Sequence, residues 1–202
     1  MITNEEERRR RAMFAFMESA TNPQAVPVPA LHIRKTCAKL LPTIAAIRAG
    51  RTDLKKSLPA VCWAATFKDN HRHAESADPT GLAYIDIDHV YDNLVRLNQA
   101  VADDTTPDKY VKCRYAHHLY SKLFHGFEEQ LGIVHAQISP SGDGLHIVFI
   151  PRVGNSIEEA QKAFAEDSGL EFYDTQCKDI SRLMFLSSTE DTLYDALDLL
   201  YQ

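Results

Sequence analysis

The residues best suited to chemistry begin with two aspartates, Asp86 and Asp88, in the apolar segment YIDID (84–88). In a β-strand, residues two apart point to the same face, so the two carboxylates would lie side by side and repel each other. A divalent cation removes that repulsion, and oxygen ligands suit Mg²⁺ and Mn²⁺. The pattern predicts a metal site, with a pair of solvent-facing aspartates on an edge strand as the alternative.

A second group follows in the segment SPSGDGLH (139–146). Small residues and glycines let backbone N–H groups approach a phosphate closely. His146 begins an apolar strand at the mouth of this turn, where its ring could donate a hydrogen bond to a phosphate. The alternative is an ordinary turn followed by a half-buried histidine.

A third group is the segment YDTQCKDISRL (173–183), in which Asp174 is followed by Lys178 and Arg182. One carboxylate beside two cations fits a further metal ligand next to groups that neutralise a triphosphate. The alternative is a solvated loop with local ion pairs, which contribute little to stability.

Short helices and strands are expected to position these residues. Strands mixed with helices, including a hairpin around the SPSGDG turn, favour an α+β fold over a doubly wound parallel sheet. Residues 1–31 are expected to form an N-terminal helix and a proline-rich linker, and residues 32–202 a single catalytic domain. The expected helices cover 5–20, 32–50, 92–102, 109–131, 156–168 and 189–202, and the expected strands cover 59–67, 81–90, 135–138, 145–151, 170–174 and 182–187.

Composition excludes several classes of protein. The 202 residues are 45% hydrophobic with a net charge of −6, which excludes extensive disorder. No apolar stretch is long enough for a membrane span, and the first residues lack the apolar core of a signal peptide. The four cysteines form no CxxC pair, which indicates reduced thiols. A cytoplasmic protein is therefore expected.

The charge is unevenly distributed. Residues 1–60 carry 11 basic and 5 acidic side chains, whereas residues 61–202 carry 11 basic and 23 acidic ones. The basic N-terminal part is the better candidate for contact with phosphate backbones.

Taken in order, the three groups resemble the motifs of the archaeo-eukaryotic primase superfamily, also called primase-polymerases. These motifs are a strand with Asp-x-Asp, a small-x-His motif and a late Asp. The chain is most similar to the N-terminal primase domain of virulence-protein-E-like primase–helicase proteins, over about residues 55–190. Many members of that branch have lysine at the position of His146, which this chain keeps as histidine. The further segments that carry the resemblance are KKSLPA (55–60), TF (66–67), GL (81–82), SPSGDGL (139–145) and KDISRLMFLS (178–187).

The resemblance implies a primase-polymerase core, a mixed sheet with an RRM-like half and an N-terminal α/β half, flanked by helices. It implies a template-dependent nucleotidyltransferase that uses two Mg²⁺ or Mn²⁺ ions, held by Asp86, Asp88 and Asp174, and no zinc is expected. The implied catalytic residues are these three aspartates and His146. The nucleotide-binding residues would be Ser139, Ser141, Gly142, Gly144, His146, Lys178, Arg182 and Ser187, and weaker candidates for nucleic-acid contact are Arg51, Lys55, Lys56 and Arg72.

The implied substrates are dNTPs or NTPs, and the implied partner is a DNA template or primer, without a membrane. A helicase or another component of a mobile-element or CRISPR-associated replication system is a candidate partner. One alternative is a catalytically degenerate module that binds nucleic acid or docks in such a system. Another is a metal-dependent nuclease or phosphotransferase, since paired acidic residues also serve that chemistry.

Overall fold

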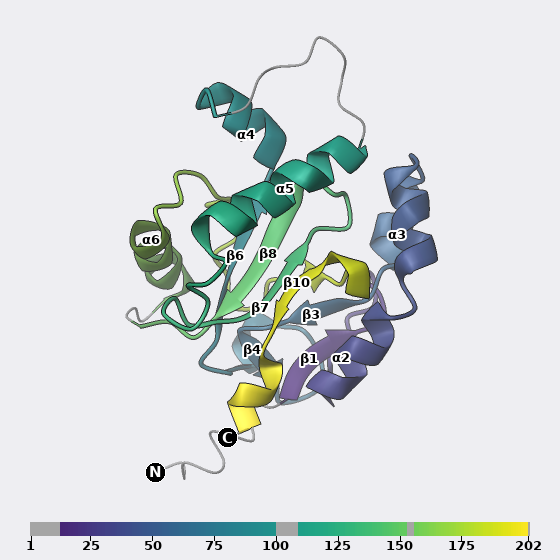
Figure 1. Cartoon of the computed structure of the whole chain (residues 1–202). Coiled ribbons are helices and arrows are strands. Elements are labelled where there is room, and N and C mark those ends of the chain that lie inside the picture. The colour runs from purple at the N-terminus through teal and green to yellow at the C-terminus, as the bar shows by residue number, and fades with distance from the viewer. Residues whose placement is uncertain (1–12, 100–108, 153–155, 202) are drawn as a thin grey trace.

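Two four-stranded sheets organise the protein in the computed structural model, which describes residues 13–99, 109–152 and 156–201 (Figure 1). The first sheet has the order β2-β1-β3-β9, and all of its pairs are antiparallel. Helices α2 and α3 pack against it through Ile33, Ile44 and Ile47. Its elements are β1 (Met13–Met17), β2 (Val26–Pro29), α2 (Ala30–Cys37), α3 (Leu41–Arg48), β3 (Ala60–Cys62) and β9 (Met184–Phe185).

The second sheet has the order β10-β7-β8-β6 and is also antiparallel. Three helices cover one of its faces, and Figure 1 shows α5 crossing this sheet. The strands are β6 (Ala83–Asp88), β7 (Ile133–Ile138), β8 (Gly144–Phe149) and β10 (Thr192–Asp195), and the helices are α4 (Val90–Arg96), α5 (Lys109–Leu123) and α6 (Ile157–Ser168).

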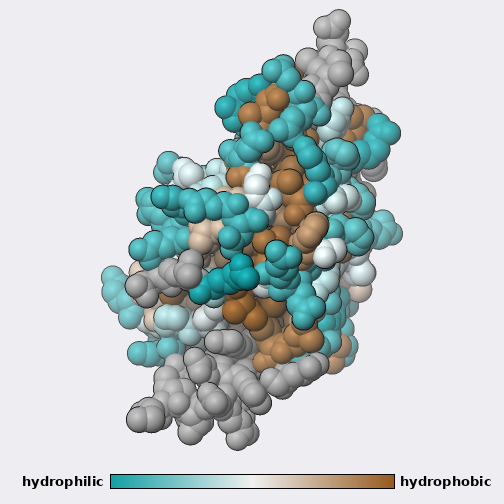
Figure 2. Space-filling model, turned by 60° about the vertical axis from the view of Figure 1, so that its left-hand side comes forward, coloured by the Kyte–Doolittle hydropathy of each residue, from teal (hydrophilic) through white to brown (hydrophobic). Residues whose placement is uncertain are grey.

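Short elements complete the described chain. A small hairpin pairs β4 with β5, and four 3₁₀ turns connect the larger elements. The face in Figure 2 is largely hydrophilic, with hydrophobic surface visible as a band between hydrophilic side chains. None of the described helices is long and apolar enough to cross a bilayer. These elements are η1 (Thr52–Ser57), β4 (Ala65–Phe67), η2 (Ala74–Ser76), β5 (Ala77–Pro79), η3 (Thr189–Asp191) and η4 (Leu197–Tyr201).

The two faces of the second sheet have different roles, as the alternation along β6 shows. Ile85 and Ile87 are fully buried among residues of α4, α5 and α6. Tyr84 points the other way, into a core shared with the first sheet. Asp86 and Asp88 follow Tyr84 at intervals of two, so they lie on this second face. The hydrophobic packing of both faces therefore fixes the direction of the two carboxylates.

The predicted N-terminal helix over 5–20 is wrong for its described part. Residues 13–17 form the central strand β1, between β2 and β3, and residues 1–12 lie outside the described chain. The run MFAFM is buried on both sides of the sheet, and an unbroken apolar run of this length does not distinguish a buried strand from a helix.

The predicted linker over 21–31 contains the strand β2, which pairs with β1. Pro27 and Pro29 are tolerated there because β2 is an edge strand, where a missing N–H breaks no ladder on the open side. Residues 13–31 are therefore part of the first sheet.

Several other expected elements are divided or replaced. The helix over 32–50 is two helices, and Pro42 lies in the first turn of the second, where its missing N–H costs nothing. The strand over 59–67 is divided into β3 and β4, and the helix over 109–131 ends at Leu123. Residues 170–174 form no strand, and the region 189–202 is the strand β10 between two 3₁₀ turns, not a helix. The α+β class, β6 and the β7–β8 hairpin are confirmed.

Candidate active site

The pairing of β6, β8 and β7 brings three polar side chains into one row. Asp86 lies opposite His146, and His146 lies opposite Gln137. His146 Nε2 is 3.7 Å from Asp86 Oδ1. The sheet therefore joins the first two sequence motifs directly, on the face that carries Tyr84.

The loop with the third motif lies along the free edge of β6. The backbone N–H of Asp174 donates to the carbonyl oxygen of Asp86 at 2.8 Å. The buried carboxamide of Gln161, on α6, donates to the carbonyl oxygens of Tyr84 and Cys177 at 3.0 and 2.7 Å. These contacts fix the loop beside Asp86 without a regular strand.

Two carboxylates and a thiol converge at this edge. The Sγ of Cys177 donates to Asp174 Oδ2 at 2.8 Å and is 3.7 Å from Asp86 Oδ2. One potential ligand atom from each of the three residues lies within 4.8 Å of the other two. Asp86 Oδ1 is buried and has no hydrogen-bond partner among the described residues. A buried oxygen without a partner is the kind of group that a cation satisfies.

The surroundings shift the pKa values of these groups in different directions. Burial raises the pKa of Asp86 to about 6, while Arg182 opposes the shift and Asp174 adds to it. The pKa of Asp174 is lowered, because the thiol of Cys177 and the N–H of Gln176 donate to its carboxylate and outweigh a burial effect. Burial, with Asp174 and Asp86 nearby, raises the pKa of the Cys177 thiol. The thiol therefore stays protonated while no cation is present.

Gln137 fixes the orientation of His146. Its Oε1 accepts the backbone N–H of Ser187 at 3.3 Å, so its Nε2 is the atom that faces Phe185 O at 2.7 Å and His146 Nδ1 at 3.1 Å. His146 Nδ1 must then accept, which leaves the ring proton on Nε2, the nitrogen nearest Asp86. Burial also lowers the pKa of His146 to about 4. The neutral ring is thus a hydrogen-bond donor aimed at the acidic cluster.

Asp88 lies on the same face as Asp86, at the end of β6, and is not one of the three residues of the cluster. It is exposed as a residue, but its carboxylate is partly withdrawn from water. Burial and then the charge of Asp86 raise its pKa, whereas His146 and Lys55 lower it. The structure therefore brings Asp86 and Asp174 together, and Asp88 adjoins them.

Among the predicted cationic residues, Arg182 and Lys55 act on the cluster. Both positive charges favour the ionised form of Asp86 and so oppose the rise in its pKa. Lys55 Nζ also lies 5.7 Å from the ring centroid of Phe185. Of the predicted cations in the described part of the chain, these two are the ones whose charges act on Asp86.

The other predicted cationic residues make contacts away from the acidic cluster or are exposed. Lys178 Nζ donates to Glu158 on α6 at 3.1 Å, Arg51 pairs with Asp53 at the surface, and Arg72 donates to Ser181 O at 3.4 Å. Lys56 is exposed.

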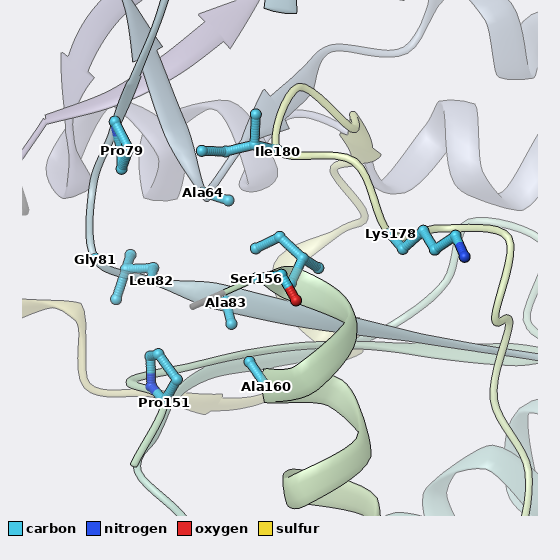
Figure 3. A pocket seen from close by; sticks show the side chains of 11 residues that line it. Ala64, Pro79, Gly81, Leu82, Ala83, Pro151, Ser156, Ala160, Lys178 and Ile180 are labelled. Atoms are coloured by element: carbon cyan, nitrogen blue, oxygen red, sulfur yellow. The ribbon is translucent and has the colours of Figure 1, made fainter. Parts of the chain in front are cut away.

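Lys178 also lines a pocket of about 380 Å³ that lies away from the acidic cluster (Figure 3). The pocket is bounded by Leu82 and Ala83 at the start of β6 and by the first turn of α6. Ala83 and Asp86 are three residues apart on an extended strand, which is a separation of about 10 Å. This pocket is therefore mostly apolar and separate from the carboxylates.

The SPSGDG turn has a specific internal structure. The hydroxyl oxygens of Ser139 and Ser141 are 3.0 Å apart, and Gly142 has φ +83°, which favours glycine. An added Cβ at Gly144 would lie 2.7 Å from Ile87 O, so glycine is required for the close pairing of β8 with β6. The turn is thus held at the end of β6, beside Asp88.

Asp143 belongs to the scaffold. Its Oδ1 accepts the N–H of Tyr91 at 3.3 Å, at the start of α4, and its Oδ2 accepts Lys112 Nζ at 2.7 Å. It also contributes to a second acidic group with His89 and Asp92, but that group is largely exposed. These bonds account for Asp143, and we assign no site to the second group.

Ser187 is fully buried, and its hydroxyl donates to Asp191 Oδ2 at 2.6 Å. Asp191 in turn pairs with Arg48 at 2.9 Å, and Arg48 donates to Ser139 O at 3.1 Å. The predicted nucleotide-binding residues Ser139 and Ser187 are therefore joined through a buried ion pair.

Sequence reasoning missed five residues that shape the site: Gln137, Gln161, Cys177, Arg48 and Asp191. The available signal for Gln137 was its position in a mostly apolar strand, where a buried amide requires hydrogen-bond partners. Gln161 had a similar signal on the apolar face of α6.

Comparison with known proteins gives one partial match. Residues 53–116 match the family described as BT4734-like, N-terminal domain. No curated protein and no solved structure matches the chain. The matched segment is similar to that family from η1 into α5, which includes Asp86 and Asp88 but neither His146 nor Asp174.

Proposed function

We propose that this chain is a template-dependent nucleotidyltransferase, a DNA primase or polymerase of the primase-polymerase superfamily. The observation that carries the proposal is the acidic cluster, in which Asp86 and Asp174 converge from separate segments, and in which the buried Oδ1 of Asp86 has no hydrogen-bond partner among the described residues. Two carboxylates held together and partly withdrawn from water are costly in a protein that only packs or docks, because like charges repel and burial disfavours the ionised form. A cation-dependent reaction gives a reason for them.

The topology supports the same proposal. Along the chain, the elements of the second half follow one another as β6, α4 and α5, β7, β8 and α6. The segment at Asp174 then returns to the free edge of β6. We propose that this part is the RRM-like half of a primase-polymerase core and that the first sheet with α2 and α3 is its N-terminal half. The expected mixed sheet is instead two four-stranded sheets in which all pairs are antiparallel.

The donor set fits the expected metal in part. Asp86 and Asp174 would hold one Mg²⁺ or Mn²⁺ ion, and a second ion would need Asp88, which lies next to the cluster and not within it. When bound, such ions activate an attacking hydroxyl and stabilise charge on the leaving phosphates.

The chain's own residues would orient the triphosphate. His146 presents its Nε2 proton to the cluster, and Arg182 and Lys55 bring positive charge to the same face. A donor oriented beforehand stabilises developing phosphate charge without reorganising in the reaction. The nucleic-acid partner would be a DNA template or primer that approaches this face. The chain would act in a cytoplasmic replication system, in which a helicase or a CRISPR-associated component is a candidate protein partner.

The proposal is tested by template-dependent incorporation, with dNTPs and NTPs supplied separately, with and without primer, in Mg²⁺ and in Mn²⁺. We expect Asp86→Asn and Asp174→Asn to reduce incorporation by about two orders of magnitude or more, which is the scale of losing one electrostatic contact to a transition state. Asp167→Asn, which changes an exposed carboxylate on α6, is the matched control.

Full incorporation by both site variants would refute the proposal. DNA binding without any metal-dependent incorporation would identify a degenerate binding module instead. Cleavage of the template by the wild type, lost in Asp86→Asn, would identify a nuclease.

A further inference from the structure

Cys177 occupies the position at which a third metal ligand would be expected. Its Sγ is one of the three atoms that converge with the carboxylates of Asp86 and Asp174. Asp88, the residue expected from its spacing to complete the set, is exposed and lies outside that group. Because Asp86 Oδ1 is buried without a partner, the cluster has an unsatisfied acceptor in addition to the thiol.

The position of Cys177 is determined by surrounding structure. The carbonyl oxygen of Cys177 accepts the buried amide of Gln161, and its N–H donates to Asp174 O at 3.3 Å. The side chain is buried with no exposed surface, so the thiol faces the carboxylates and not solvent. Cys177 also belongs to the hydrophobic core shared with the first sheet, and its Sγ is the atom that faces the two carboxylates.

The separations are suited to shared coordination. Ligands at about 2.3 Å for sulfur and about 2.1 Å for oxygen on a tetrahedral ion lie roughly 3.6 Å apart. The distance from Cys177 Sγ to Asp86 Oδ2 is 3.7 Å, whereas the distance to Asp174 Oδ2 is 2.8 Å because a hydrogen bond joins the two atoms. Loss of the thiol proton would remove that bond and allow both atoms to face one cation.

We infer that Cys177 is a metal ligand of this site, so that the site binds thiophilic divalent ions such as Zn²⁺ or Co²⁺ in preference to Mg²⁺. On binding, the thiol proton is released to solvent and the thiolate forms the metal–sulfur bond, with no change of oxidation state. A thiolate favours softer ions, whereas Mg²⁺ prefers an all-oxygen octahedron. This inference deepens the proposed function, on whose metal site it rests, and it opposes the expectation of no zinc.

The test uses Co²⁺ added to the full chain. We expect a near-ultraviolet sulfur-to-cobalt charge-transfer band at one equivalent in the wild type. Cys177→Ser keeps the size of the side chain and should abolish the band. Cys113→Ser, which changes a half-buried thiol on α5, is the matched control and should retain it.

Affinity gives a second measurement. We expect Cys177→Ser to weaken Co²⁺ and Cd²⁺ binding by at least about tenfold, since even outer-shell changes act on this scale. Mg²⁺ binding should change much less. Should the serine variant fail to fold, cadmium NMR of the wild type reports sulfur ligation directly.

A band that persists in Cys177→Ser, or a wild type without one, overturns the inference. These results test the metal ligand and do not by themselves test the polymerase function. A Cys177-dependent band without nucleotide incorporation would support Cys177 as a metal ligand and refute the polymerase function. Incorporation without a band would support the polymerase function and refute Cys177 as a ligand.

Discussion

The carboxamide of Gln137 lies between His146 and the end of β9, with all of its bonds inside the protein. It donates to Phe185 O and His146 Nδ1 and accepts the N–H of Ser187. A residue of this kind touches no reacting atom, yet it determines which nitrogen of His146 carries the proton. Its contribution should therefore be visible in stability and in the state of the histidine ring.

We expect Gln137→Leu to reduce the free energy of unfolding by about 2–4 kcal/mol, because buried backbone groups lose their partners at about 1–3 kcal/mol each. Urea denaturation measures the change. Gln176→Leu, which alters an exposed side chain in the loop after Asp174, should leave the free energy nearly unchanged. Equal effects of the two variants would show that the Gln137 network does not stabilise the fold.

The buried histidine His135 predicts how the stability of the fold changes at acidic pH. It is 3% exposed, stacks on Trp63 with ring centroids 5.2 Å apart, and has no hydrogen-bond partner for either ring nitrogen among the described residues. Burial lowers its pKa to about 4; Asp195 and Gln137 oppose that shift, while His146 and Arg34 add to it.

Between pH 6.5 and 4 the unfolded chain binds a proton at residue 135 that the folded chain excludes, so His135 makes stability fall as the pH falls. The slope is at most about 1.4 kcal/mol per pH unit. We expect His135→Phe, which keeps an aromatic ring against Trp63, to remove this contribution. Unfolding free energies of both proteins across this range measure it, and parallel profiles for the two would contradict the assignment.

At the scale of elements, the SPSGDG turn depends on the close approach of β8 to β6. A Cβ added at Gly144 would meet Ile87 O at 2.7 Å, Ser139 Oγ at 3.1 Å and Asp88 Oδ1 at 3.2 Å. The strand pair must separate at this end to admit it, which displaces Asp88 as well.

We expect Gly144→Ala to cost about 1–3 kcal/mol of stability, as overpacking does. Amide hydrogen exchange should quicken at the paired ends of β6 and β8. Gly126→Ala is the control for hydrogen exchange: its methyl group meets no atom within 4 Å, so the strain of alanine at φ +85° should stay within its own turn and leave exchange at β6 and β8 unchanged. Unchanged exchange at β6 in Gly144→Ala would show that the strand end tolerates the methyl group.

The same elements show what sequence could predict. The alternation of Tyr84, Asp86 and Asp88 with apolar residues predicts both β6 and the direction of its carboxylates, because a period of two is a local property of a strand. The hairpin was also predictable, since its turn residues lie between two apolar runs. Residues 13–17 were not predictable as a strand, because their burial on both faces depends on β2 and β3.

The candidate site was less predictable than the fold around it. Asp86 and Asp174 were identified as partners through a resemblance, but their contact depends on a loop held by Gln161 and by a single backbone bond, neither of which has a local signature. Cys177 had no apparent role in the sequence because its neighbours in space come from β6.

At the scale of the whole molecule, a buried ion pair joins the two halves of the fold. Arg48 on α3, which packs with the first sheet, pairs with Asp191 at 2.9 Å and donates to Ser139 O in the turn of the second sheet. The two side chains are 11% and 6% exposed. Asp191 also accepts the hydroxyl groups of Ser187 and Ser188. Charges this deeply buried must be compensated by each other.

We expect Asp191→Asn to reduce the free energy of unfolding by about 3 kcal/mol or more, because it leaves Arg48 buried without a counter-charge. Arg48→Met should have a similar cost, and the double variant should be less destabilised than the two single effects added together. A double-mutant cycle by urea denaturation measures this coupling.

The exposed pair of Arg152 and Asp167, 3.5 Å apart, is the control and should couple by less than about 1 kcal/mol. Strictly additive effects at Arg48 and Asp191 would mean that the halves are held together by the shared hydrophobic core alone. A strong coupling would mean that each charge compensates the other at the place where the two halves meet.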